Sequence, residues 1–289
     1  MYRKVKYLIP AYDVDMGGIP VKQALPTNNV NQVDPFLLLH HGKFTFSENA
    51  PALHQGIGPH PHRGFTPVTF VIEGEVHHRD SWGNSNIAKK GEVQWMHAGA
   101  GIVHSERPSQ ALADSNGTQE IVQLWINSPT NKKMQQPKYQ FISEKDIPVL
   151  TSEDNGIINK LIAGKWNDLR SPIETESELL IIWSKADSGG SQTFILPEMF
   201  NVMLYVVRGN LKIRSYGMVE KESLVVFDNN AETIEVLADP DTEFLILAGL
   251  PINEPVVQQG PFVMNTTTEI LEAMRDYQMG KMGILIEEK

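Results

Sequence analysis

The sequence predicts an all-β protein built from two related β-domains, with a helix only near its C-terminal end. Three observations lead to this fold class. Short apolar runs typical of strands recur at close intervals, and turn residues separate them. A stretch of the first half that begins at residue 70 resembles a stretch of the second half that begins at residue 205. Helical periodicity is confined to the segment after residue 266.

Length and composition describe an ordinary globular protein. The 289 residues favour two domains, and 41% hydrophobic with 21% charged residues suit a buried core. The net charge of -10 argues against a phosphate-binding surface, so we expect no direct contact with nucleic acid. The absence of cysteine excludes disulfides, thiolate nucleophiles and sulfur-ligated metals, and it fits a reducing compartment. Without a long apolar stretch or a leader-like start, a cytoplasmic protein without a membrane anchor is expected.

The first half shows strand signals in close succession. Residues 1–33 are rich in turn residues and predict short strands and loops. An apolar run then predicts a strand that is buried on both faces, and further strand signals follow it, at residues 34–41, 68–72, 75–78, 92–96 and 120–126. Turn signals separate them at residues 73–74, 82–84 and 90–91. This spacing is typical of a β-sandwich or a barrel.

The second half resumes the same rhythm after a polar, basic segment. Residues 127–140 contain Pro129 and Pro137 and lead to a predicted domain boundary, which gives domains 1–143 and 144–289. Strand signals follow at residues 156–164, 179–183, 202–207, 211–213, 223–227, 233–237 and 243–247. Residues 267–277 predict a short helix whose inner face carries Ile270, Leu271 and Met274, with Thr266 or Thr267 as its N-cap.

The two halves differ in their histidines. Phe70-Val-Ile-Glu-Gly-Glu-Val-His resembles Tyr205-Val-Val-Arg-Gly-Asn-Leu-Lys, which indicates a duplicated β-domain. The same offset carries His60 and His62 onto Ile195 and Pro197, neither of which binds metal. All nine histidines lie between residues 40 and 104. We therefore expect an ion in the first domain only.

Two pairs of candidate ligands stand in that domain: His60-Pro-His62 and His104-Ser-Glu106. Residues i and i+2 of a strand project to the same side, so each pair can direct both side chains at one point. The pair His60 and His62 alone is equally well explained by histidines that line a barrel or lie at the surface and make ordinary hydrogen bonds. Together they predict three imidazoles and one carboxylate around one ion, with His60, His62, His104 and Glu106 as ligands.

This donor set restricts the ion and leaves room for substrate. Imidazole and carboxylate without thiolate suit Fe(II), Mn(II), Ni(II), Cu(II) or Zn(II). Four protein ligands on an octahedral ion leave two positions open, whereas a structural zinc is usually tetrahedral and closed. Other chemistries lack their motifs, because the sequence contains no Gly-x-Ser-x-Gly elbow, no Gly-x-Gly-x-x-Gly turn and no phosphate-binding loop.

The other histidines are expected to have ordinary structural roles. His77 and His78 are adjacent, so at most one of them can face the interior of a strand-built domain. His97 is expected to be exposed to solvent, with contact to a metal ligand as the alternative. His40, His41 and His54 are expected to make ordinary contacts rather than to border a cavity. Gly99 and Gly101 are expected to allow close backbone approach to the His104 strand.

Several stretches resemble the pirin family of the cupin superfamily. They are Pro59-His-Pro-His-Arg-Gly-Phe, His78-Arg-Asp-Ser, the run from Gly91 to Glu106 and the run from Glu254 to Thr266. The resemblance implies two tandem cupin-type, jelly-roll β-barrels, with one metal ion, usually iron as Fe(II), in the N-terminal barrel. It also carries the ligand role onto His60, His62, His104 and Glu106. Family members commonly have Glu where this chain has Thr66, so a carboxylate near the substrate is absent.

The family resemblance implies a quercetin 2,3-dioxygenase type of activity, with a flavonol-like aromatic and dioxygen as substrates. On this hypothesis Glu106 accepts the proton of the substrate hydroxyl. Apolar side chains could line the pocket or equally pack the core: Phe65, Phe70, Trp95 and Met96. One alternative is a non-catalytic, iron-dependent regulatory protein with a protein partner, as some nuclear family members act as transcription cofactors. Another is an isomerase or hydrolase that uses the metal as a Lewis acid.

Overall fold

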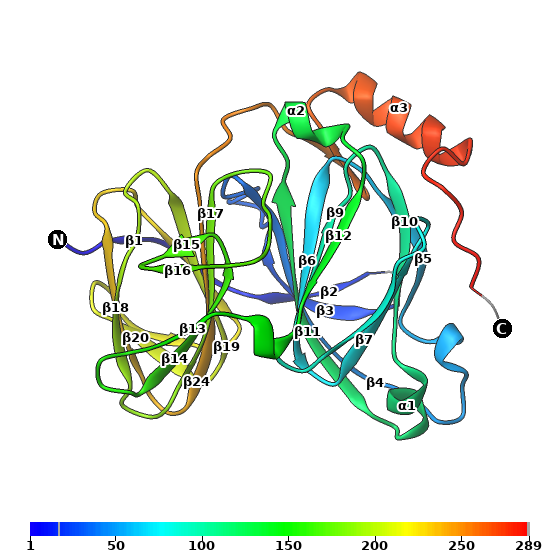
Figure 1. The fold of residues 1–289 in the computed structure, drawn as a ribbon. Coiled ribbons are helices and arrows are strands. Elements are labelled where there is room, and N and C mark those ends of the chain that lie inside the picture. The colour runs from blue at the N-terminus through cyan, green and yellow to red at the C-terminus, as the bar shows by residue number, and fades with distance from the viewer. Residues whose placement is uncertain (17, 288–289) are drawn as a thin grey trace. The chain divides into compact units, whose positions relative to one another are not determined.

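The computed structural model describes residues 1–16 and 18–287 and divides the chain into two compact units (Figure 1). Unit 1 comprises Met1–Leu38 and Lys145–Ile252, and unit 2 comprises Leu39–Glu144 and Asn253–Lys289. The domains expected from the sequence, 1–143 and 144–289, agree with the central boundary to within one residue. They differ at both ends of the chain, because each unit incorporates a terminal segment from the other half.

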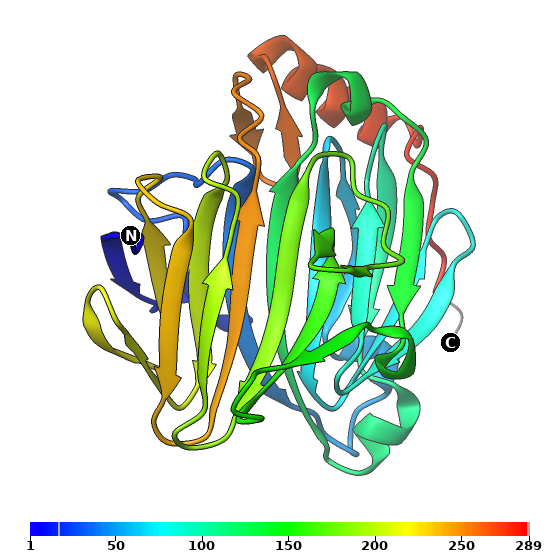
Figure 2. The same ribbon diagram turned by 60° about the vertical axis from the view of Figure 1, so that its left-hand side comes forward.

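Unit 1 is a barrel of two facing antiparallel sheets (Figures 1 and 2). In spatial order the larger sheet consists of β1 (Val5–Pro10), β22 (Ser223–Phe227), β19 (Asn201–Arg208), β24 (Thr242–Gly249), β17 (Leu179–Ala186), β14 (Ile157–Ala163) and β13 (Val149–Thr151). The smaller sheet consists of β18 (Ser191–Ile195), β23 (Thr233–Ala238), β20 (Asn210–Ile213) and β21 (Gly217–Glu220). Two hairpins accompany them, β2 (Tyr12–Asp15) with β3 (Pro20–Leu25) and β15 (Lys165–Trp166) with β16 (Leu169–Arg170).

The interior of unit 1 is apolar. One continuous cluster contains Leu204 and Phe244 of the larger sheet together with Phe194, Ile234 and Val236 of the smaller sheet. Each of these side chains is almost completely removed from solvent. Alternation along the strands directs them inward, so burial of apolar surface holds the two sheets together. The N-terminal strand β1 belongs here because it pairs antiparallel with β22.

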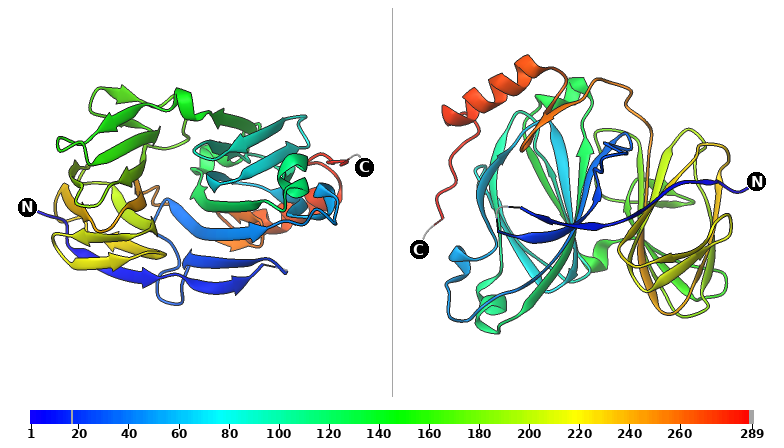
Figure 3. Two further views of the ribbon diagram at one scale, coloured as in Figure 1. Left: turned by 90° about the horizontal axis from the view of Figure 1, so that it is seen from below. Right: turned by 180° about the vertical axis from the view of Figure 1, so that it is seen from behind.

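Unit 2 has the same two-layer plan (Figure 3). One sheet contains β12 (Lys138–Ile142), β9 (Val93–His97), β6 (Phe65–Glu73), β11 (Thr118–Asn127) and β4 (Phe36–Thr45), which begins in unit 1. The β2–β3 hairpin continues this sheet, with β3 next to β4. The other contains β5 (Ile57–His62), β10 (Ile102–Arg107), β7 (Glu75–Asp80) and β8 (Ser85–Lys89). Short helices lie in the connections between strands: η1 (Ala52–His54), α1 (Gln110–Asp114), α2 (Thr130–Lys133) and η2 (Glu144–Asp146). Helix η2 begins at Glu144, the last residue of the first segment of unit 2.

The polar segment 127–140 is part of unit 2 rather than a free linker. It contains α2 and the start of β12, and β12 pairs antiparallel with β9. Lys133 of α2 is buried, and its ammonium donates to the Gly64 carbonyl at 2.7 Å and to Asn127 Oδ1 at 2.6 Å. The predicted approach to a boundary is therefore folded into the last strand before that boundary.

The C-terminal segment packs on unit 2 and ends in the predicted helix. Strands β25 (Val257–Gln259) and β26 (Phe262–Met264) precede α3 (Thr267–Gln278), and Phe262 and Met264 share an apolar cluster with Val103 of β10. Arg63 pairs with Asp276 of α3 at 3.1 Å, and Arg107 pairs with Glu287 at 2.8 Å. These buried contacts assign the segment to unit 2.

Helix α3 begins as the sequence predicts. Thr266 is its N-cap and forms a capping box with Glu269, which satisfies backbone donors of the first turn. Its buried face carries Ile270 and Ala273. The prediction for Leu271 was wrong, because this residue is 60% exposed. The face of the helix that packs on β26 carries Ile270 and Ala273 instead. None of the helices among the described residues is long and apolar enough to cross a membrane.

The internal repeat has a structural counterpart in β6 and β19. Each is flanked by two antiparallel neighbours, β9 and β11 in unit 2 and β22 and β24 in unit 1. Each ends at a glycine with φ of +74°, Gly74 and Gly209. A Cβ atom would lie 2.3 Å from the carbonyl oxygen of Thr118 in the first case and of Asp241 in the second. Both barrels therefore require glycine at the same turn.

Candidate metal centre

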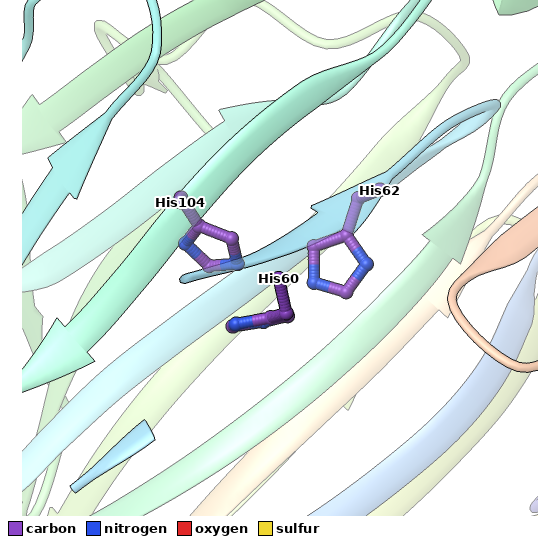
Figure 4. A group of neighbouring side chains, drawn as sticks. All are labelled: His60, His62 and His104. Atoms are coloured by element: carbon purple, nitrogen blue, oxygen red, sulfur yellow. The ribbon is translucent and has the colours of Figure 1, made fainter. Parts of the chain in front are cut away.

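Three histidines of unit 2 converge inside the barrel (Figure 4). His60 and His62 lie on β5, and His104 lies on β10 directly opposite His60 in the antiparallel register. One ring nitrogen from each residue lies within 4.8 Å of those of the other two. The ring centroids are 4.3 to 4.9 Å apart. The i, i+2 spacing of the first pair and the strand pairing of β5 with β10 produce this arrangement.

Two of the three imidazoles, those of His62 and His104, are held in the neutral form that a metal requires. Burial, and secondarily the neighbouring His60, hold the pKa of His62 well below its usual value. Burial, together with the other three rings around it, does the same to the pKa of His104. Both side chains are 2% exposed, whereas that of His60 is half-buried. Neutral imidazole has a free lone pair, so these rings can bind a cation at neutral pH.

Hydrogen bonds to the outer ring nitrogens leave the inner ones available. His60 Nδ1 lies 2.8 Å from the Gly58 carbonyl oxygen, and His62 Nδ1 lies 3.4 Å from that of Pro261. Nε2 of His104 is buried and has no hydrogen-bond partner. A buried polar atom without a partner is costly in a stable protein unless something binds it. The donor chemistry of the cluster therefore fits a divalent transition metal.

Behind His104 stands a second buried pair, His78 and Asp80 of β7. His104 Nδ1 lies 3.4 Å from His78 Nδ1, and His78 Nε2 lies 3.0 Å from Asp80 Oδ2. Burial alone would raise the pKa of Asp80, but hydrogen bonds from His78 and Asn84 outweigh burial and lower it. Of the two adjacent histidines, His78 faces inward and is 2% exposed, whereas His77 reaches Ser85 Oγ near the surface. The expected opposition of these side chains is confirmed.

Glu106 points across the barrel to the opposite sheet. Its Oε1 accepts hydrogen bonds from Thr69 Oγ1 at 3.1 Å and from Gln123 Nε2 at 3.2 Å, while Oε2 accepts from Gln123 Nε2 at 3.0 Å. The close cluster of ring nitrogens contains His60, His62 and His104 but not this carboxylate. The structure thus gathers three of the four predicted ligands and holds Glu106 on the same interior face of β10.

An aromatic wall adjoins His62. The ring centroid of Phe65 lies 5.0 Å from that of His62, and the centroid of Trp125 lies 5.4 Å from it. Phe65 is buried and Trp125 is half-buried. Trp125 Nε1 donates to Gln123 Oε1 at 3.3 Å, which directs the amide group of Gln123 at Glu106. Phe65 was predicted either to line a pocket or to pack the core. Trp125, Gln123 and Thr69 were not predicted, although each shares the inner face of its strand.

The prediction for His97 was wrong. Its side chain is 2% exposed, because β9 lies between β12 and β6 and all five of its residues are buried. Its Nδ1 lies 3.4 Å from the hydroxyl of Thr66, the residue at which this chain departs from the family pattern. Thr66 is equally buried. A small polar side chain and an imidazole thus share the interior at this position.

The remaining sequence-predicted residues lie apart from the cluster. His40 and His41 are buried on β4, and His41 pairs with Glu120 at 3.0 Å; His54 lies in η1. Phe70, Trp95 and Met96 are buried and 0 to 3% exposed, as core residues are. Gly99 and Gly101 have φ of +48° and +133°, and a Cβ atom at Gly99 would lie 2.1 Å from a backbone oxygen. The expected positive φ and close neighbours are confirmed, but the neighbours are the Gln135 backbone and the Met282 side chain rather than the His104 strand.

Comparison with known proteins gives a consistent result. The Pirin family model matches residues 18–126, and the model of the pirin C-terminal cupin domain matches residues 184–283. A pirin-like protein of Solanum lycopersicum is 35% identical over 96% of this chain and 92% of its own length. The crystal structure of quercetin 2,3-dioxygenase from Acinetobacter baumannii is 36% identical, with a TM-score of 0.91 over 99% of this chain and all of that one (100%).

A more distant structure shares the fold. The bacterial pirin YhhW from Escherichia coli, solved in complex with nickel(II), is 21% identical with a TM-score of 0.66, covering 85% of this chain and 99% of that one. Both barrels are thus of the cupin type that the family resemblance implies. With more than nine-tenths of its length aligned at 35% identity to a pirin-like protein, the chain belongs to the pirin family.

Proposed function

We propose that this protein is a metal-dependent dioxygenase of the quercetin 2,3-dioxygenase type, acting on flavonol-like aromatics. The observation that carries the proposal is the convergence of three imidazoles at His60, His62 and His104, of which the last two are buried with lowered pKa values. The similarity to the Acinetobacter baumannii quercetin 2,3-dioxygenase over nearly the whole chain supports the reaction class. The ion is a divalent transition metal, with Fe(II) as the first choice and Mn, Ni, Cu or Zn compatible with the same donors.

Glu106 completes the proposed ligand set and serves as proton acceptor. A carboxylate oxygen can accept about two hydrogen bonds. Oε1 already accepts two, whereas Oε2 accepts one, from Gln123. Oε2 therefore retains a lone pair that can face the ion or receive the hydroxyl proton of the substrate. Thr69 and Gln123 hold the carboxylate in place for either task.

The surroundings of the cluster suit a flat aromatic substrate. When bound, the metal supplies Lewis acidity toward adjacent hydroxyl and carbonyl oxygens and the redox chemistry that dioxygen requires. Phe65 and Trp125 form an apolar wall beside His62 that can stack on an aromatic ring and keep water away. The partly exposed His60 marks the side from which substrate reaches the cluster.

The test combines metal analysis with oxygen uptake. Protein purified without chelator is expected to contain about one transition metal ion per chain and to consume dioxygen in step with a flavonol. The matched control is the flavone that lacks only the 3-hydroxyl group, which we expect not to react. Full metal content with no oxygen uptake on any flavonol would contradict the dioxygenase. A pull-down that recovers a partner only with metal-loaded protein would then identify a regulatory protein instead.

A further inference from the structure

His78 and Asp80 are buried behind the metal centre, although neither belongs to the proposed ligand set. Both lie on β7, which pairs with the His104 strand so that Asp80 stands directly opposite His104. Their function follows from which ring nitrogen of each of the three imidazoles carries the hydrogen atom and which keeps the lone pair for the metal. The inference rests on the metal centre proposed above and assigns a role to two residues outside it.

For His60 and His62 the backbone determines the tautomer. Each ring presents Nδ1 to a carbonyl oxygen, that of Gly58 or Pro261. A carbonyl oxygen only accepts, so Nδ1 carries the hydrogen and Nε2 keeps the lone pair that a metal needs. His104 lacks this arrangement, because its Nδ1 faces another imidazole nitrogen, Nδ1 of His78. A pair of imidazole nitrogens can share a hydrogen in either sense, so the pair alone does not fix the tautomer of His104.

Asp80 removes the ambiguity. Its Oδ2 lies 3.0 Å from His78 Nε2, and a carboxylate only accepts. His78 therefore carries its hydrogen on Nε2 and presents a lone pair at Nδ1. His104 Nδ1 must then donate to His78, which leaves His104 Nε2 without hydrogen. That nitrogen is the buried atom without a partner.

Both residues are held rigidly enough for this task. Asp80 Oδ1 accepts from the backbone amides of Trp82 at 2.9 Å and Asn84 at 3.1 Å, so the carboxylate cannot turn freely. The His78 ring stacks on Tyr139 with centroids 4.3 Å apart and an angle of 13° between the planes. A hydrogen-bonded carboxylate and a stacked ring keep the orientation of each donor and acceptor fixed.

We propose that Asp80 and His78 are positioning residues that set the tautomer of His104 and thereby the metal affinity of the cluster. Outer partners of metal-binding histidines have this effect in general, typically about 10- to 100-fold in affinity. Here the effect passes through two successive hydrogen bonds, from His104 to His78 and from His78 to Asp80. The tautomer of His104 therefore depends on Asp80 Oδ2 being a hydrogen-bond acceptor.

The decisive variant is Asp80→Asn. Asparagine can keep Oδ1 for the two backbone amides, but it places an NH₂ group against His78 Nε2. His78 must then accept at Nε2 and donate at Nδ1, which moves the hydrogen of His104 onto Nε2. We expect metal affinity, measured by competition with a chromogenic chelator, to fall by about 10- to 100-fold. In metal-free protein, long-range ¹H–¹⁵N spectra should show the ring hydrogen of His104 moving from Nδ1 to Nε2.

Two controls separate this role from a general disturbance. Asp154→Asn alters another turn aspartate, which accepts from the amides of Gly156 and Ser191 in unit 1, where there is no histidine. His77→Phe alters the neighbour of His78 on the opposite face of β7. Both are expected to leave metal affinity within about twofold of the wild type.

His78→Phe provides a second route, because phenylalanine can still stack on Tyr139. It should weaken metal binding, and adding Asp80→Asn to it should weaken binding no further, since Asp80 acts only through His78. Equal affinity of wild type and Asp80→Asn, or additive losses in the double variant, would overturn the inference while leaving the metal centre intact. A wild-type protein that binds no transition metal would overturn the metal centre and this inference together.

Discussion

The two barrels have the same arrangement of strands, but the inner side chains are polar in unit 2 and apolar in unit 1 at corresponding positions. In unit 2 the inner pair on β5 and β10 is His60 opposite His104, and in unit 1 the inner pair on β18 and β23 is Phe194 opposite Ile234. The next inner position on the second strand is Glu106 in unit 2 and Val236 in unit 1. The scaffold therefore does not require a polar centre, and burial of apolar surface suffices to close it.

The difference shows what a polar interior needs. Each of the three converging imidazoles of unit 2 has a partner for its outer nitrogen, from a carbonyl or from another side chain. Unit 1 has no such requirement, because its core side chains carry no polar atoms at these positions. A polar centre thus depends on partners from several strands, and its loss should change function more than fold.

Glu106→Gln should have the largest effect, on turnover. The amide is nearly isosteric with the carboxylate but cannot accept the substrate proton, so kcat on a flavonol should fall by roughly 10²- to 10⁴-fold. Some metal should remain bound, because the three imidazoles are unchanged. Oxygen uptake at matched metal content measures the effect. Unchanged turnover would exclude Glu106 as the proton acceptor.

Phe194→Ala tests the apolar counterpart. Phe194 is fully buried and packs against Trp166 and Phe244, with centroids 5.7 and 6.2 Å away. The cavity should lower the free energy of unfolding by about 3–5 kcal/mol. Hydrogen exchange should increase in unit 1, while the metal content of the folded protein stays the same. Loss of metal in this variant would mean that the two barrels are not separable in function.

His62→Ala changes the polar centre of unit 2 instead of the apolar core of unit 1. Removing one of three converging imidazoles should release most of the metal, with a loss of affinity of at least the roughly 100-fold that an outer partner can cost. Far-ultraviolet circular dichroism should show that the sheets persist, because their cores remain. Elemental analysis that finds full occupancy in this variant would mean that the ligand set is wrong.

Acidification should destabilise unit 2 selectively. Burial lowers the pKa of His40 to about 4, against about 6.5 in the unfolded chain. Between these values the unfolded chain binds the proton and the folded barrel does not, so stability is lost as the pH falls from about 6.5 to 4. The loss from His40 is of the order of 3 kcal/mol at the lower end.

Unit 1, which contains no histidine, provides the internal control for that experiment. Hydrogen exchange of metal-free protein at pH 6.5 and 4.5 should show that the protection factors of unit 2 fall more on acidification than those of unit 1. His40→Gln should reduce the pH dependence without abolishing it, because the pKa values of His62 and His104 are also lowered. An identical pH dependence in the variant would show that His40 does not contribute.

The sequence was informative wherever local alternation decides the structure. His60 and His62 on one strand, and His104 and Glu106 on another, could be placed on common faces from their spacing alone. The offset of the repeat was less reliable, since it led to Ile195, which is 67% exposed, whereas the inward residue of β18 is Phe194. A shift of one residue between repeats reverses which face a side chain occupies.

The rest depends on pairing between distant strands. The spacing of His78 and Asp80 predicts a shared face, but only the register of β7 with β10 places them behind His104. The contacts of Glu106 with Thr69 and Gln123 require two sheets to face each other. Likewise, the burial of His97 follows from the neighbours of β9 and not from the glycine-rich residues that follow it.

The exchange of terminal segments has a consequence for synthesis on the ribosome. Residues 5–10 emerge first, yet their partner strand, residues 223–227, is made more than two hundred positions later. The first-made barrel likewise waits for residues 253–289, including the arginine-paired carboxylates of its final helix and tail. Each unit therefore acquires its last segment only late in synthesis, and cutting the gene near codon 144 should yield two fragments, one without the β1 edge strand and the other without the segment that packs on β10.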